Sequence, residues 1–244
     1  MGFLGAVGAV VGAIGSAVGA MLSGASAVCG ALGGVVGALG STFCTSLAAG
    51  ITALGVGDVI AVIMAVAKVV SWIAEKLGLT TEDEQPEDLG MKAEQADKKP
   101  EDFDSIEEYI KYLREEVEID KEKMEKLSPE EKAKYAAVGS AILVQGIEEK
   151  YKMQLPAEFW CTVADKNMDK EQIKCLLDTF KEKGMTDMKD LDDYLNNRKI
   201  ESGTPRSEIS DTIIEAIKKQ NPGISQEDID AAFDKMMTEH QYRK

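Results

Sequence analysis

The first 57 residues lack any charged side chain, and the whole chain has one histidine and only 6% aromatic residues. The four charged residues between positions 58 and 78 cancel, so the net charge of −15 lies in residues 79–244. No basic patch offsets this acidity, which argues against binding to nucleic acid. The uncharged N-terminal part is therefore suited to an apolar environment, and the acidic part, residues 79–244, is suited to water.

Several chemistries are excluded by what is missing. A single histidine, His240, excludes a His-dependent catalytic triad and a multi-His metal site. The four cysteines are scattered and contain no CxxC pair, and no glycine-rich segment continues into GK[ST]. Residues 165–171 resemble the start of an EF-hand loop, but Lys170 and Leu176 stand where that loop needs glycine and glutamate. We therefore predict no enzyme, no bound metal and no cofactor.

Glycines recur in the apolar N-terminal segment at alternating spacings of three and four residues. On a helix this spacing places them on one narrow stripe. The residues are Gly5, Gly8, Gly12, Gly15, Gly19, Gly30, Gly33, Gly37 and Gly40. Each glycine costs a helix in water about 1 kcal/mol relative to alanine, whereas small residues allow helices to approach closely in a membrane. The array therefore predicts helices that pack tightly within a lipid bilayer.

Three apolar stretches have the length, about 20 residues, that a helix needs to cross the hydrocarbon layer. We expect two spans near 3–22 and 28–48, joined at residues 23–27. A third candidate, 58–77, is richer in bulky residues and either spans the bilayer or lies along its surface.

Polar side chains in the third stretch follow a pattern. Asp58, Lys68 and Ser71 fall near one stripe of a helix and are candidates for the lining of a pore. Trp72 and Lys76 are candidates for anchors at the headgroup boundary, where amphipathic side chains settle.

The acidic part of the chain predicts further helices and no alternating strand pattern. Residues 79–103 hold two prolines, many charges and few bulky side chains, which predicts a disordered linker. Residues 104–155 predict a helical hairpin whose uncharged centre, Ala136–Ile147, is too short to span a membrane and is expected in a core. Residues 156–244 predict a small acidic helical bundle with helices near 157–165, 169–183, 187–197, 207–220 and 226–240.

The predicted fold class is therefore all-α. A Gly/Ala-rich transmembrane-type hairpin of two or three helices (residues 1–78) is followed by the acidic linker and a soluble helical bundle.

The glycine pattern of residues 2–57 resembles the glycine-zipper segments of bacterial pore-forming effectors and of phage proteins ejected into the cell envelope. This resemblance covers about a quarter of the chain and does not extend to residues 79–244. It implies self-association through the glycine stripe, hence a homo-oligomer. The Lys/Glu/Met-rich tail and the absence of a disulfide pattern favour a bacterial or phage source.

Two functions from different classes follow. In the first, the protein inserts into a bilayer, associates with itself and perforates or bridges the membrane, after delivery from a soluble or particle-bound form. The acidic tail then serves solubility, delivery or docking to a protein partner or carrier. In the second, the apolar hairpin is buried in a membrane complex or particle and nothing leaks. A third interpretation, a soluble helical oligomer that hides the hairpin until it is triggered, has the same final state as the first.

Overall fold

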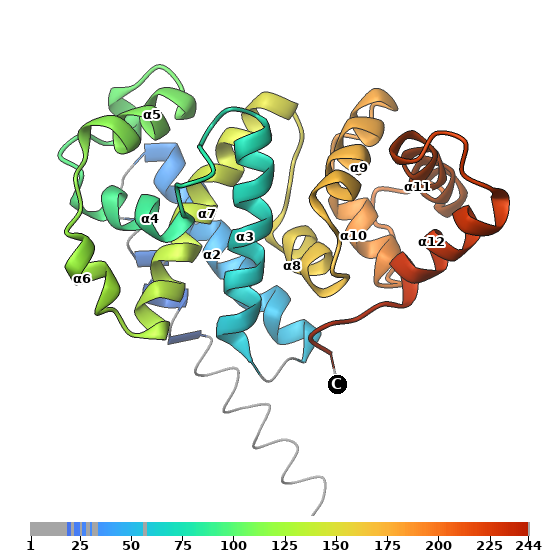
Figure 1. Cartoon of the computed structure of the whole chain (residues 1–244), viewed down its shortest axis with the longest axis horizontal. Helices are drawn as coiled ribbons and strands as arrows, with labels where there is room; N and C mark the ends of the chain where they lie inside the picture. Colours follow the sequence, from blue (N-terminus) through green and yellow to red (C-terminus); the bar gives the residue numbers. More distant parts are fainter. Residues whose placement is uncertain are drawn as a thin grey trace, which may run out of the picture.

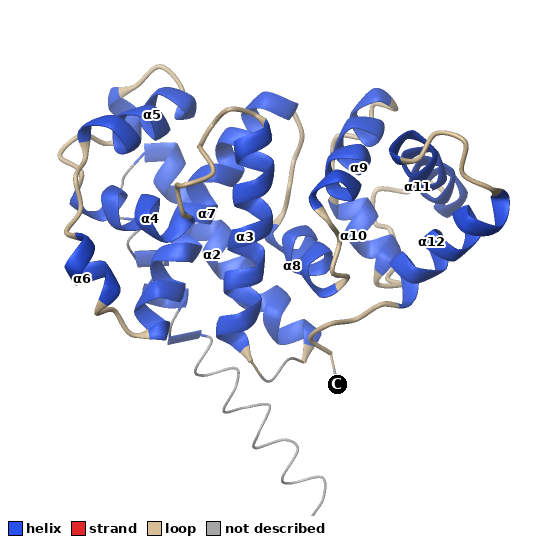
Figure 2. Ribbon diagram, viewed as in Figure 1, coloured by secondary structure: helices blue, strands red, loops and turns tan. Residues whose placement is uncertain are grey.

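The computed structural model describes residues 19, 20, 22–24, 26, 27, 30, 34–55 and 58–243. These residues form helices joined by loops and contain one isolated parallel β-bridge, between Gln154 and Asp187, but no strand (Figure 2). The all-α prediction is therefore confirmed. In chain order the elements are α2 (Gly34–Leu54), α3 (Val59–Lys76), α4 (Pro86–Gln95), the 3-10 turn η1 (Pro100–Asp102), α5 (Ile106–Glu116), α6 (Lys121–Glu125), α7 (Pro129–Tyr151), α8 (Ala157–Asp165), α9 (Lys170–Glu182), α10 (Lys189–Leu195), α11 (Arg206–Gln220) and α12 (Gln226–Thr238).

Helix α7 is the centre of the bundle, with α2, α3, α4 and α5 packed around it (Figure 1). Its start is fixed by a capping box, in which Ser128 Oγ accepts from the amide of Glu131 at 3.2 Å and Glu131 accepts from the amide of Ser128 at 2.8 Å. Every residue from Tyr135 to Ile147 is buried. A helix that is buried all round belongs in a core, so the prediction for Ala136–Ile147 is confirmed.

Helix α3 is a core helix of this bundle. Eight of its residues are buried, and it packs against α7 and α8. The prediction that 58–77 spans or lies on a membrane does not describe this packed form, because the same apolar face is buried by other helices of the chain. Within the expected region 1–78, the described helices α2 and α3 share one hydrophobic core with α7 through α12.

The expected disordered linker is wrong over residues 79–103. Leu79 is buried, and α4 and η1 are ordered within the segment. Helix α4 buries Leu89, Met91 and Ala93, and it packs along α7 through glycine backbone on both sides. Helix α4 is ordered with few bulky residues because glycines lie at its contact with α7. Without side chains between them, the two backbones pack very closely.

Helices α8 to α12 lie to one side of α7, with α9 against α11 and α11 against α12 (Figure 1). The predicted helix at 157–165 coincides with α8, and the other four agree with α9 to α12 to within a few residues. Gly184, at φ 74°, follows the end of α9 in the left-handed conformation that glycine adopts without strain.

At the junction expected at residues 23–27, the described residues Ser23, Gly24, Ser26 and Ala27 are helical. Of the second expected span, 28–48, the described residues, Gly30 and 34–48, are helical as well. Ser26 lies against α2, because Ser41 Oγ donates to its carbonyl at 2.9 Å. Of the expected first span, 3–22, residues 3–18 and 21 lie outside the described residues.

Candidate functional site: the faces of α2 and the cavity beside it

Helix α2 has two faces, and neither carries a charge. The buried face, which meets α7 and α8, consists of Gly37, Gly40, Phe43, Cys44, Leu47, Gly50 and Ile51. The exposed face consists of Ala38, Leu39, Thr42, Thr45, Ala49, Thr52 and Ala53. A helix at the surface of a soluble protein ordinarily presents charged and polar residues to water. The exposed face of α2 presents methyl groups and hydroxyls, with Leu39 50% exposed.

The hydroxyls on that exposed face are already satisfied inside the helix. Thr42, Thr45 and Thr52 each donate to the carbonyl four residues earlier, at 3.0, 2.9 and 2.8 Å. Such back-bonded hydroxyls need no water, and in hydrocarbon every polar group must be satisfied internally. The exposed face of α2 therefore meets the hydrogen-bonding requirement for contact with lipid.

Among the described residues, the stretch Gly37–Leu54 of α2 has the length and composition needed to cross a bilayer, and no other described helix does. Core helices of soluble proteins share these properties, and fewer than half of this stretch is buried here.

The glycines of the predicted stripe differ in their exposure where the structure describes them. Gly5, Gly8, Gly12, Gly15 and Gly33 lie outside the described residues, and Gly19 and Gly30 are exposed. Gly37 and Gly40 lie on the buried face of α2, so in this form part of the stripe packs within the chain.

The polar candidates of 58–77 lie at two places on α3. Asp58 is the N-cap of α3, where its carboxylate accepts from the amide of Ala61 at 3.0 Å. Lys76, the expected anchor, lies 3.9 Å from the carboxylate of Glu171.

Lys68, Ser71 and Trp72 lie together in a groove of about 550 Å³ between α3 and α4. The Lys68 ammonium lies 4.9 Å from the centre of the Trp72 ring, within cation–π range. Glu87 of α4 lines the same groove, and burial raises the pKa of its carboxyl. Lys68 and Ser71 of the predicted pore-lining stripe therefore line the groove beside α4 in this form, whereas Asp58 caps α3.

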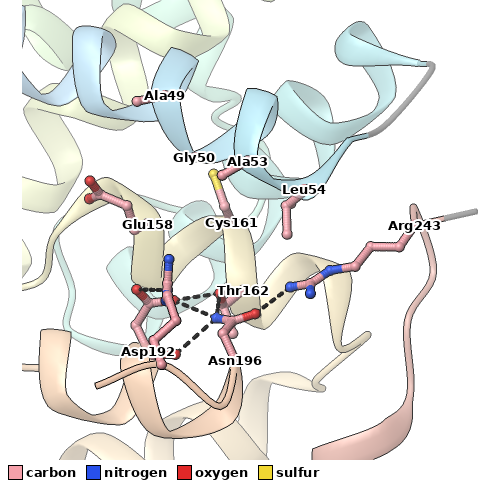
Figure 3. A pocket seen from close by; sticks show the side chains of 11 residues that line it. Ala49, Gly50, Ala53, Leu54, Glu158, Cys161, Thr162, Asp192, Asn196 and Arg243 are labelled. Carbon is pink, nitrogen blue, oxygen red and sulfur yellow. Dashed lines mark hydrogen bonds and ion pairs between the residues drawn. The ribbon is translucent and has the colours of Figure 1, made fainter. Parts of the chain in front are cut away.

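A second cavity of about 380 Å³ lies between α2 and the helices α8 and α10 (Figure 3). Its apolar wall is the last part of α2, Ala49 to Leu54. Its polar wall is a hydrogen-bonded network in which Thr162 Oγ donates to Asp192 at 2.6 Å and the amide nitrogen of Asn196 donates to the same carboxylate at 2.9 Å. Arg198 and the C-terminal Arg243 complete the wall.

The polar wall of this cavity contains a buried carboxylate, Asp192, that is paired with the guanidinium of Arg198. Asp192 is fully buried, and desolvation raises the pKa of its carboxyl against the opposing hydrogen bond from Thr162 and the charge of Arg198. Burial also raises the pKa of the Cys161 thiol, which lies between this wall and α2. A thiol with a raised pKa is a poor nucleophile. In the described part of the chain no group of three His, Cys, Asp or Glu side chains could hold a metal ion.

The sequence analysis missed the partners of Asp165. This carboxylate is fully buried at the end of α8 and meets His240 and Arg243 from the C-terminus. The sequence places Asp165 in an acidic turn before α9, and Asp169 does cap α9 there. No local pattern links positions separated by 75 residues.

No family model matches the sequence, and the comparisons with curated proteins and with solved structures give no match. The glycine-zipper resemblance therefore stays a prediction.

Proposed function

We propose that the protein is a membrane-inserting protein in a packed helical form, and that α2, with the uncharged segment before it, enters the bilayer and associates with other copies. One observation carries the proposal: the exposed face of α2 bears no charge, and its three threonine hydroxyls are bonded within the helix.

The small-residue face of α2 supports self-association. Gly37, Gly40 and Gly50 lie on the buried face of α2, and a Cβ atom on Gly50 would lie 3.0 Å from the sulfur of Cys161 in α8, so this face packs closely in the folded chain. The same small residues permit close packing of membrane helices against one another. On release, α2 exchanges partners within its own chain for lipid and for other copies of α2. The stripe of Lys68 and Ser71 on α3 then becomes available to line a pore.

The test is a single charge on the exposed face. Thr45→Lys leaves the fold within about 0.5 kcal/mol of wild type, because the site is exposed. In a bilayer a central lysine costs about 2.5–3.5 kcal/mol, which weakens insertion about a hundredfold. The measurement is co-flotation with phospholipid vesicles and release of an entrapped dye.

Two controls accompany this variant. Thr45→Val keeps the face uncharged and retains binding, whereas Ser207→Lys adds the same charge to an exposed site at the start of α11 and leaves binding unchanged. Wild-type protein that neither floats with lipid nor releases dye would contradict the proposal. It would instead favour an α2 whose uncharged face is covered by a protein partner.

A further inference from the structure

The chain beyond α12 returns to α8 and is fastened there. The amide of Gln241 donates to the carbonyl of Asp165 at 2.7 Å, and the amide of Tyr242 donates to its carboxylate at 3.2 Å. His240 Nδ1 and Arg243 Nε lie 2.7 and 2.8 Å from the same carboxylate oxygen. We call residues 239–243 the C-terminal strap.

The fastening point is a fully buried carboxylate, Asp165. A buried charge is stable only when it is paired and hydrogen-bonded. In the described part of the chain, the groups that meet this carboxylate all belong to the strap. Beside it, Lys166 Nζ donates to the carbonyl of Met237 at 2.6 Å and lies 3.5 Å from His240 Nε2.

The strap also lines the cavity that borders the end of α2. Arg243 donates to the amide oxygen of Asn196 and lines the cavity whose other wall is Ala49 to Leu54 (Figure 3). Tyr242 is close enough to Asp58, the N-cap of α3, for the charge of Asp58 to contribute to the rise in the pKa of Tyr242, after burial and the charge of Asp165.

We propose that the C-terminal strap restrains the end of α2 in the packed form and that its release frees α2 for insertion. This inference rests on the proposed function and adds its regulation. The strap joins the ends of α8 and α10 and closes one side of the cavity that borders the last turns of α2. A protein partner or protease that removes the strap therefore leaves these turns beside an open cavity.

The restraint can be tested without lipid, by hydrogen exchange of the full chain in water. In His240→Ala/Arg243→Ala, we expect the amides of residues 49–54 to exchange about tenfold faster than in wild type, because two charge-assisted contacts are lost. Asp165→Asn/His240→Ala/Arg243→Ala removes the same contacts without leaving an unpaired buried charge. We expect the amides of residues 49–54 to exchange as fast in this triple variant as in the double variant. Lys126→Ala breaks an exposed ion pair with Glu122 in α6, outside the strap, and is the matched control.

Unchanged exchange at 49–54 in both strap variants would overturn the inference. The same proteins are then mixed with vesicles, where the strap variants are expected to associate about tenfold faster than wild type and the Lys126→Ala control. Equal rates for all four would overturn the regulatory role while the proposed function stands. Faster exchange with no association in any protein would instead refute the proposed function and leave the restraint intact.

Discussion

Gly90 of α4 and Gly139 of α7 face each other where the two helices come closest. A Cβ atom on Gly90 would lie 3.0 Å from the amide nitrogen of Gly139 and 2.1 Å from the carbonyl oxygen of Tyr135. A Cβ atom on Gly139 would lie 1.8 Å from the carbonyl oxygen of Pro86. These contacts are with backbone atoms, which cannot move aside without separating the helices. A close glycine contact therefore lies in the acidic part of the chain, outside the predicted stripe.

We predict that Gly139→Ala lowers the free energy of unfolding by about 3 kcal/mol, because α4 must move away from α7. Gly146→Ala on the same helix is the matched control. Its new methyl group meets only the flexible ends of Ile110 and Leu79, at 3.0 and 3.1 Å, so we expect a change within about 1 kcal/mol. Urea denaturation followed by circular dichroism measures both. Equal losses in the two variants would contradict the account of α4.

Glu148 predicts a pH dependence of stability. Desolvation raises the pKa of its carboxyl above the ordinary 4.5, against a hydrogen bond of 2.6 Å from the amide of Leu155. The ionised form therefore costs stability above the folded-state pKa, and that cost disappears as the pH falls toward 4.5. Glu148→Gln keeps the acceptor and removes the charge. We expect it to be more stable than wild type at pH 7 in urea denaturation, by a margin that shrinks on acidification; a margin that grows would show the opposite sign of shift.

Lys68 separates pore lining from membrane binding. Lys68 is exposed, and its ammonium group makes a cation–π contact with the Trp72 ring. Lys68→Leu should cost no more than about 1 kcal/mol of stability. If Lys68 lines a pore, this substitution abolishes conductance in planar bilayers and leaves vesicle association intact. Conductance equal to that of wild type would refute the lining role.

Asp58 has a structural role in the packed form. Because its carboxylate caps α3, we predict that Asp58→Ala loses about 1 kcal/mol of stability. Asp58→Asn retains a capping oxygen and should lose only about 0.3 kcal/mol of stability. Thermal unfolding of the two variants measures the difference. A similar loss in both would mean that the charge, rather than the cap, stabilises the helix.

Helices with their own start signals were predictable from the sequence. Ser128-Pro129 before an uncharged run is a start signal for α7, and the break at Leu155-Pro156 precedes α8. Helix α4 was not predictable, because its stability comes from the closeness of Gly90 to α7 rather than from bulky side chains. Its composition is that of a linker.

The site was predictable only in part. Local hydrophobicity cannot distinguish a lipid environment from a protein core, which is why the stretch now seen as α3 suggested a membrane span although α7 and α8 bury it. Lys68 and Ser71 of the predicted stripe line one groove, because helical spacing places them together, and Trp72, predicted as a headgroup anchor, lines the same groove. Their roles as pore lining and anchor stay predictions. The pairing of Asp165 with His240 and Arg243 depends on how the chain folds back, which local spacing does not encode.

The central claim, that α2 leaves the bundle to enter lipid, can be tested by locking α2 in place. A Cβ atom on Gly50 would lie 3.6 Å from Cβ of Cys161 and 3.0 Å from its sulfur. That spacing matches the Cβ separation of a disulfide, about 3.5–4.5 Å. Gly50→Cys therefore allows α2 to be cross-linked to α8 by oxidation, with Gly50→Ser treated identically as the control.

The measurement is dye release from vesicles by oxidised Gly50→Cys, with the cross-link verified by mass spectrometry, before and after reduction with dithiothreitol. We predict that the cross-linked protein releases no dye, that reduction restores release, and that Gly50→Ser releases dye throughout. Release by the verified cross-linked protein at the wild-type rate would contradict the account, because α2 would then act without leaving α8.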